Sequence, residues 1–233
     1  MTDVVELIPL ETGRVREVGV PIPVYLLRLT GGRHALVDTG CARAVIGDPE
    51  SHFVLTEEEH VVGRLRALGL SPADIGTVVV SHFDPDHAGA NDEFPGAEFV
   101  VQRAQYEHAR TSGLYRYEWF RGQWDDPRLR YRLVDGDTEL LPGVTLLECG
   151  GHVPGHQAVL VRLPETGTVL LAGDAWARGT EAQTRPMSPF DLDEGETRKA
   201  QRRLMDLARR LPVDLVVHNH DAEQWASLRP SYR

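Results

Sequence analysis

The feature that most constrains the fold of this chain is a series of short apolar runs, most of them bounded by Gly, Pro or Asp. Short runs rich in Val, Leu and Ile are typical of buried β-strands. The runs are Val4–Leu10, Val24–Leu29, Ala35–Val37, Thr77–Val80, Glu98–Val101, Val144–Leu147, Ala158–Leu163, Thr168–Leu171 and Val213–Val217. The sequence therefore predicts strands in both halves of the chain.

Three stretches between these runs carry apolar residues at three- and four-residue intervals, as amphipathic helices do. They are Glu57–Leu68, which ends at Gly69, then Gln102–Arg110, and Glu194–Leu211, which stops before Pro212. Strands in both halves with a few helices predict a layered α/β or α+β fold. Because 233 residues without repeat or linker suit one core, we expect a single domain over residues 1–233.

The segment Ser112–Arg132 is aromatic and charged but has no clear period. We interpret it as an excursion over the edge of the sheet. Its aromatic side chains either border a pocket or simply pack, and it is also a candidate surface for a homodimer.

Composition excludes some classes of partner. With 25 Lys and Arg against 35 Asp and Glu, the formal net charge is −10, which argues against nucleic-acid or anionic-membrane binding. The two cysteines, Cys41 and Cys149, are expected to be reduced thiols. Neither a signal-peptide pattern nor a run of ~20 apolar residues occurs, so a cytoplasmic location is expected.

Five of the predicted strands end at a His or Asp side chain. Strand ends are where sheet proteins usually place ligand crevices, because side chains there leave the packed interior and can converge. The residues at these ends are Asp38; His82, Asp84, Asp86 and His87; His152; Asp174; and His218, His220 and Asp221.

The densest cluster is the run from His82 to His87, which holds four potential ligands in six residues. Pro85 is expected to prevent a regular strand or helix there, and a solvated loop is the alternative interpretation. Imidazole and carboxylate without thiolate suit zinc, iron or manganese. Six or seven such groups exceed the needs of one ion, so we expect two ions roughly 3.5–4 Å apart that share a carboxylate and a hydroxide, the nucleophile of a hydrolase.

Several segments along almost the whole chain match a known family. They are Leu36–Cys41, Ser81–Asn91, Phe94–Gln102, Val134–Asp137, Pro142–Val144, Gly151–Gln157, Gly173–Ala175 and His220–Trp225. In these segments the sequence resembles the metallo-β-lactamase superfamily and, through its Pro-Gly-His-Gln and His-Asp-Ala-Glu-Gln runs, the N-acyl homoserine lactonase group.

The resemblance implies a four-layer αββα sandwich with two metals at one edge. It implies that His82, Asp84 and His152 hold one metal, that Asp86, His87 and His220 hold the other, and that Asp174 bridges them. Asp86 is implied as the proton shuttle to the leaving alkoxide. Asp38 and His156 are implied to orient the ligands rather than bind metal, and His218 is not expected to be a ligand.

Two positions depart from the family pattern. The family's second motif histidine is replaced by Asp84, a hard anionic oxygen. We therefore expect two divalent ions, zinc first, with iron or manganese as the alternative and a weakened first site as a further possibility. The lactonases also place a Tyr three residues after the bridging Asp, where this chain has Ala177. Another donor or the metal must then hold the substrate carbonyl, and Tyr25, Tyr115 and Tyr117 are the candidates.

The resemblance implies a dinuclear metallohydrolase that opens lactone rings, with N-acyl homoserine lactones as the expected small-molecule substrates and quorum quenching as the expected role. Another ester, thioester or phosphoester hydrolase is the alternative enzyme. A non-hydrolytic diiron or metal-binding member is the alternative of a different class.

Overall fold

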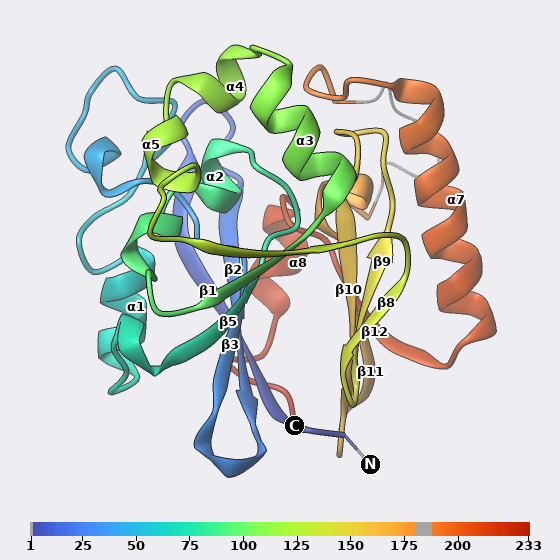
Figure 1. The fold of residues 1–233 in the computed structure, drawn as a ribbon. Helices are drawn as coiled ribbons and strands as arrows, with labels where there is room; N and C mark the ends of the chain where they lie inside the picture. The colour runs from blue at the N-terminus through green and yellow to red at the C-terminus, as the bar shows by residue number, and fades with distance from the viewer. Residues whose placement is uncertain (1, 180–187) are drawn as a thin grey trace.

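The structure, a computed structural model, describes residues 2–179 and 188–233 and contains two mixed β-sheets (Figure 1). The larger sheet has the spatial order β4 (Phe53–Val54), β1 (Val4–Val15), β2 (Pro21–Leu29), β3 (His34–Val37), β5 (Ile75–Val79), β6 (Glu98–Gln102) and β7 (Arg130–Val134). The smaller sheet has the order β12 (Val213–Val217), β11 (Gly167–Leu171), β10 (Gln157–Leu163), β9 (Val144–Glu148) and β8 (Thr138–Leu141).

Helices cover the outer faces of the two sheets, which gives the layer order helix, sheet, sheet, helix (Figure 1). Beside the larger sheet lie α1 (Val61–Ala67), α2 (Pro85–Ala88), α3 (Arg103–Thr111), α4 (Tyr115–Glu118) and α5 (Arg121–Trp124). Outside the smaller sheet lies α7 (Glu194–Arg210), and α8 (Ala222–Ser227) follows β12. Single 3₁₀ turns occur at Thr30–Gly32, Arg43–Val45, Pro72–Asp74, Asn91–Glu93 and Gly173–Trp176. The αββα layering expected from the family resemblance is confirmed.

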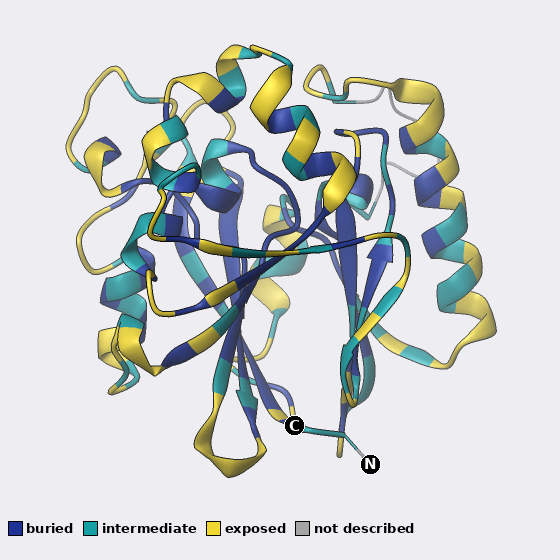
Figure 2. Ribbon diagram, viewed as in Figure 1, coloured by how far each residue is buried: buried dark blue, intermediate teal, exposed yellow. Residues whose placement is uncertain are grey.

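The core lies in separate layers, as the buried ribbon of both sheets shows (Figure 2). Residues such as Leu27 and Val37 of the larger sheet share one buried cluster with Val159 and Val169 of the smaller one. On the outer face of the smaller sheet, Leu204 of α7 packs on Leu170 and Leu147. Each sheet is therefore apolar on both faces, as expected when helices or a second sheet cover both sides.

One buried polar side chain links the two sheets. The Gln157 amide, at the start of β10, donates to the carbonyl oxygens of Val80 (2.8 Å) and Val100 (3.1 Å) and accepts from Gln102 Nε2 (3.1 Å). Its partners all belong to the larger sheet or the loop after it. Because a buried amide retains its hydrogen bonds only in one alignment, Gln157 fixes how the sheets sit relative to one another.

The strand predictions are confirmed at all nine runs, although β1 continues from the predicted end at Leu10 to Val15. Helices were also expected in the right places, although α1 begins at Val61 rather than Glu57 because residues 57–59 form turns. The expectation for Pro85 was wrong: Pro85 occupies the first turn of α2, where its missing N–H costs no hydrogen bond.

The interpretation of Ser112–Arg132 was wrong at its end. This segment forms α4 and α5 and then enters the edge strand β7 at Arg130. Tyr117, Phe120 and Trp124 are buried, whereas Tyr115 and Trp119 are exposed, so most of the aromatic side chains pack. Among the described residues, no helix is long and apolar enough to span a bilayer.

Candidate metal centre

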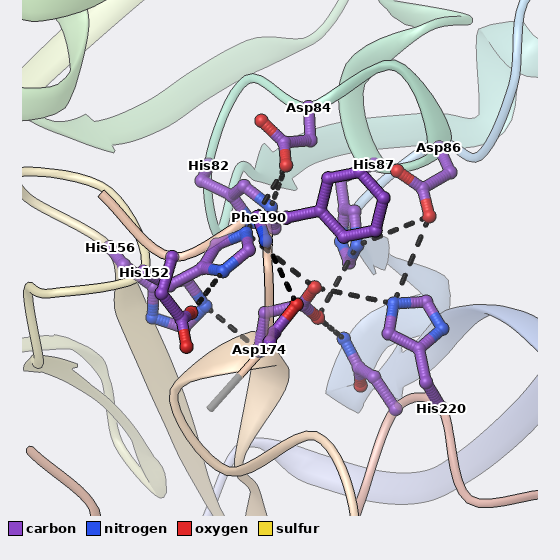
Figure 3. Close-up of polar contacts among 12 residues, drawn as sticks. His82, Asp84, Asp86, His87, His152, His156, Asp174, Phe190 and His220 are labelled. Carbon is purple, nitrogen blue, oxygen red and sulfur yellow. Dashed lines mark hydrogen bonds and ion pairs between the residues drawn. The ribbon is translucent and has the colours of Figure 1, made fainter. Parts of the chain in front are cut away.

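The five predicted strand ends converge at one edge of the sandwich. β3 and β5 are parallel neighbours in the larger sheet, and β11 and β12 are parallel neighbours in the smaller one. Strand β9 points the same way as β11, because both are antiparallel to β10. The loops after all five strands therefore meet, and their His and Asp side chains point toward one another (Figure 3).

The shape of two of these loops depends on specific residues. Pro85 starts α2 directly after Asp84, so the helix turns Asp86 and His87 back toward the site. Gly173 has a φ of 58°, and a Cβ there would lie 2.6 Å from Cε1 of His156. Only glycine therefore fits just before Asp174.

Two groups of side chains have ligand atoms close enough to share an ion. His82, His152 and Asp174 form the first group, and Asp86, His87 and His220 form the second; within each group the ligand atoms lie within 4.8 Å of one another. Each group combines loops from both sheets.

Asp174 belongs to the first group and also contacts two histidines of the second (Figure 3). Its Oδ1 is 3.4 Å from Nε2 of His87, and its Oδ2 is 3.3 Å from Nε2 of His220 and 3.7 Å from Nε2 of His152. A carboxylate in this place can contact an ion in each group, which is the bridging position of a two-metal site.

The four histidines of these groups share one arrangement. In each ring Nδ1 contacts an oxygen: Ser81 Oγ at 2.9 Å from His82, Asp38 at 2.8 Å from His87, Asp191 at 2.8 Å from His152, and the Pro21 carbonyl at 2.9 Å from His220. An Nδ1–H that donates outward leaves the Nε2 lone pair facing inward, as in metal-ligating histidines.

Two of these inward atoms lack hydrogen-bond partners. His82 and His87 are fully buried, and the Nε2 atom of each has no hydrogen-bond partner within the described chain. Buried polar atoms are rarely left unpaired, and an ion is one partner that satisfies them. The residues present therefore fit a metal centre.

Asp38 is linked to both groups, directly through His87 of the second group and through Ser81, which contacts His82 of the first. Its carboxylate accepts from Ser81 N (2.7 Å), Ser81 Oγ (2.7 Å) and His87 Nδ1. Because the Ser81 hydroxyl donates to Asp38, its oxygen accepts from His82 Nδ1. Asp38 also has a φ of 63°, the single positive value outside glycine within the described chain, which Asp tolerates better than most residues.

The buried histidines and carboxylates of the site shift one another's pKa values. Burial opposes ionisation of His87, but Asp174, Asp86 and Asp38 raise its pKa to about 10. Burial likewise opposes the charged form of His152, but the hydrogen bonds that its ring donates to Asp191 and Asp84 raise its pKa to about 9. Burial would raise the pKa of Asp174, but His220 and His87 hold it well below its usual range. The carboxylates therefore stay anionic and attract cations.

His156 and His218 are occupied by other partners. His156 Nε2 accepts from Asp174 N at 3.1 Å, and its Nδ1 lies 3.2 Å from Sγ of Cys149. His156 thus holds the backbone of Asp174 rather than facing the ligand groups. His218 Nδ1 donates to the Trp176 carbonyl at 2.9 Å.

Asp84 lies at the site but outside both ligand groups. Its Oδ2 is 3.4 Å from Nε2 of His82 and 3.2 Å from Nε2 of His152, yet both of its oxygens accept from the guanidinium of Arg116 on α4. Its assignment as a metal ligand stays a prediction.

Of the three candidate tyrosines, Tyr25 is fully buried and donates its hydroxyl to Asn219 Oδ1 at 2.9 Å. Asn219 in turn donates to Asp174 at 3.3 Å. Tyr117 is buried, and Tyr115 is 78% exposed on the surface of α4. Tyr25 is therefore linked to Asp174 through Asn219.

Sequence reasoning missed Arg116, Asp191, Ser81 and Asn219 as residues of the site. Ser81 and Asn219 are neighbours of ligands in the sequence, and that position was the signal that could have found them. Arg116 and Asp191 come from segments without a recognisable pattern, and only folding places them beside Asp84 and His152.

Known proteins of similar sequence and structure place this chain in a family. The model of the metallo-beta-lactamase superfamily matches residues 18–220. The N-acyl homoserine lactonase AttM of Azorhizobium caulinodans is 33% identical, over 97% of this chain and 92% of that protein.

Two solved structures share the fold. AiiA of Bacillus thuringiensis with N-decanoyl-L-homoserine bound at its active site superimposes with a TM-score of 0.86, at 29% identity and over 98% of both chains. An N-acyl homoserine lactone hydrolase with the product N-hexanoyl-L-homoserine at its catalytic metal centre gives the same TM-score, identity and coverage. From the matched family model and these whole-chain likenesses, this protein belongs to the metallo-beta-lactamase superfamily.

Proposed function

We propose that this protein is a metal-dependent hydrolase that opens the ring of N-acyl homoserine lactones. The observation that carries the proposal is the convergence of the Nε2 atoms of His87, His152 and His220 on Asp174, with His82 in the same ligand group as Asp174. Each of the four rings is fixed through its Nδ1. The support for the substrate class is whole-chain similarity to a lactonase and to structures with ring-opened acyl homoserines bound.

In this proposal two divalent ions bind between the sheets. His82, His152 and Asp174 would hold the first ion, with Asp84 beside it, and Asp86, His87 and His220 would hold the second. Asp174, which contacts His87 and His220, would be shared with the second ion. Zinc suits the histidine-rich donors, and iron or manganese is the alternative because of the carboxylate at Asp84. When bound, such ions activate a water molecule and polarise an ester carbonyl.

Asp86 is the proposed proton shuttle. Its Oδ2 lies 3.8 Å from Nε2 of both His87 and His220, and its side chain keeps 13% exposure, so it reaches the site and the solvent together. When the oxygen of a water molecule adds to the lactone carbonyl carbon, Asp86 would accept a proton from that water. It would then deliver this proton to the ring oxygen as the C–O bond breaks, and the second proton of the water would pass to solvent. The products are then an alcohol and a carboxylate.

Exposed aromatic rings offer an apolar surface near the site. Tyr115 of α4, Trp119 directly after α4, and Phe190 are all exposed. Arg116 of α4 joins the two segments because it donates to the Phe190 carbonyl at 2.8 Å. We propose this surface as the contact for an acyl chain. The same exposed rings are a candidate contact of a homodimer, which size-exclusion chromatography with light scattering tests.

The test is direct. The zinc-loaded chain is incubated with N-hexanoyl-homoserine lactone, and ring-opened acid is measured by mass spectrometry. Ring opening above the spontaneous rate, lost after chelation and restored by metal, supports the proposal. No ring opening by protein of verified metal content overturns it. The proposed role in quorum quenching is tested separately, by measuring degradation of such lactones in cells. The proposed cytoplasmic location is tested by fractionation of those cells.

A second enzyme class is favoured by one observation. Ala177, at the position where the lactonases carry Tyr, has no hydroxyl to hold a lactone carbonyl, and its own carbonyl accepts from His220 N at 3.0 Å. Hydrolysis of another ester, thioester or phosphoester is therefore the second candidate. A panel of chromogenic esters and phosphotriesters, compared with the lactone by kcat/KM, separates the two.

A further inference from the structure

Arg116, on the one-turn helix α4, uses all three guanidinium nitrogens as hydrogen-bond donors. Its Nε donates to Asp84 Oδ1 at 2.7 Å, its Nη2 donates to Asp84 Oδ2, and its Nη1 donates to the Phe190 carbonyl at 2.8 Å. The side chain is only 17% exposed. The guanidinium is therefore fixed, and it holds the Asp84 carboxylate in a bidentate pair.

This pair lies against the first ligand group (Figure 3 shows its Asp84). Asp84 Oδ2 is within 3.4 Å of Nε2 of His82 and 3.2 Å of Nε2 of His152, close enough for the carboxylate to join these ligands. Arg116 Nη2 itself lies 3.3 Å from Nε2 of His152. The positive charge of Arg116 therefore lies where it would repel a cation bound to the first group, and it pairs with the Asp84 carboxylate beside that group.

The second ligand group is different. The ion pairs of Asp86 in the described structure join it to His87 and His220, both members of its own group. Asp38, another anion, supports that group through His87. A carboxylate supports a histidine of each group, since Asp191 contacts His152 of the first group as Asp38 contacts His87 of the second. The difference between the two groups in the described structure is Arg116, which contacts Asp84 and His152 on the side of the first group.

We propose that Arg116 is a positioning residue that withholds Asp84 from the first metal position, so that the two positions fill in order, the second group first. This inference rests on the metal centre of the proposed function but not on the substrate. Without the guanidinium, Asp84 becomes a fourth ligand for the ion at His82, His152 and Asp174. Lysine in its place keeps the charge but cannot form the bidentate pair.

The experiment measures metal binding without catalysis. Chelator-treated protein is titrated with cobalt(II), and binding is followed by calorimetry and by the visible absorption of the ion, which reports its coordination. The variants are Arg116→Gln, Arg116→Lys, Asp84→Asn and the double variant Arg116→Gln/Asp84→Asn. Arg121→Gln is the matched control, because Arg121 pairs with Glu118 and Asp125 away from the site.

Wild-type protein is expected to bind one equivalent tightly and a second more weakly. Arg116→Gln tightens the weaker equivalent by on the order of tenfold, the scale on which groups around metal ligands change affinity. It also changes the cobalt spectrum of that equivalent. Arg116→Lys gives a smaller gain, the double variant loses the gain, and Arg121→Gln leaves both affinities unchanged.

The opposing results are equally distinct. Equal or weaker binding of the second equivalent in Arg116→Gln overturns the inference, and so does a double variant that keeps the full gain. Circular dichroism verifies that each variant is folded, and Arg116→Lys carries the test if Arg116→Gln is not. Wild-type protein that binds no metal overturns the metal centre as well, whereas an Arg116 effect without lactone hydrolysis overturns only the proposed substrate.

Discussion

The Asp38 carboxylate lies 2.8 Å from Nδ1 of His87, and this contact joins the end of β3 to the loop after β5. It fixes the ring so that Nε2 of His87 faces Asp174 at 3.4 Å. A ligand that the protein already orients binds an ion without first losing conformational entropy, so we expect Asp38 to strengthen metal binding at His87 without contacting the ion.

Replacement of Asp38 by Asn is expected to weaken metal binding by about 10–100-fold while the chain stays folded. Asn tolerates a positive φ, but its amide places a donor where Ser81 and His87 offer donors. Chelator competition measures the affinity, with Asp206→Asn on the exposed surface of α7 as the control. Unchanged affinity would show that the Asp38 contact does not orient His87.

The Asp86→Asn variant is expected to lower kcat for lactone opening by about 10²–10⁴-fold, because the amide cannot deliver a proton. Steady-state kinetics at saturating lactone measure the effect, and elemental analysis establishes that metal content matches the wild type. A variant with full metal and an unchanged kcat would remove Asp86 from the proton-transfer role.

Tyr25→Phe is expected to cost about 1–3 kcal/mol in the free energy of unfolding, because Asn219 Oδ1 then lacks its buried donor. It also frees Asn219, which donates to Asp174, so a moderate fall in kcat accompanies the loss. Urea denaturation measures the stability. Tyr115→Phe is the control because Tyr115 is exposed, and an equal effect in both variants would refute the Tyr25–Asn219 link.

His60 predicts a component of the acid sensitivity of the fold. This side chain is buried at the start of α1, where its Nδ1 accepts from Val62 N at 3.4 Å. Burial lowers the pKa of His60, and Arg43 lowers it further. The unfolded chain therefore binds a proton near pH 6.5 that the folded chain takes up only at lower pH, so this group destabilises the fold as pH falls below about 6.5.

The His60→Asn variant keeps a helix-capping acceptor but does not titrate. Its unfolding free energy is compared with that of the wild type between about pH 8 and pH 5. We expect the advantage of the wild type to shrink toward the acid end. A difference that stays constant with pH would mean that His60 is not the titrating group.

Most of the fold could be predicted because its strands are buried, and a buried strand appears in the sequence as a short apolar run. Runs such as Val213–Val217 need no knowledge of their partners. Strand β7 was missed because it is an edge strand, in which exposed Arg130 and Arg132 alternate with Tyr131 and Leu133. The two charged residues interrupt the apolar run by which the other strands were predicted. Pro85 was misjudged because a proline excluded from a helix interior is favoured in its first turn.

The candidate ligands could be predicted because four of them lie in one run and the others follow apolar strands. The state of Asp84 could not, because it depends on Arg116, thirty-two residues away in a segment without a period. Likewise nothing in the sequence near His152 indicates Asp191, which lies thirty-nine residues later. Contacts that tertiary structure alone creates leave no local pattern to read.

Each ligand group takes residues from the loops of both sheets, so an ion in either group would act as a removable cross-link between two halves of the chain. Such a tie restricts the unfolded ensemble as a disulfide does, and its strength follows the concentration of free metal. The lifetime of this protein would then depend on metal supply: starved of metal, the chain opens more often and is cleaved sooner by proteases. The half-life of the chain during digestion by trypsin, measured with and without chelator, tests whether bound metal protects the fold. Equal half-lives would exclude such protection.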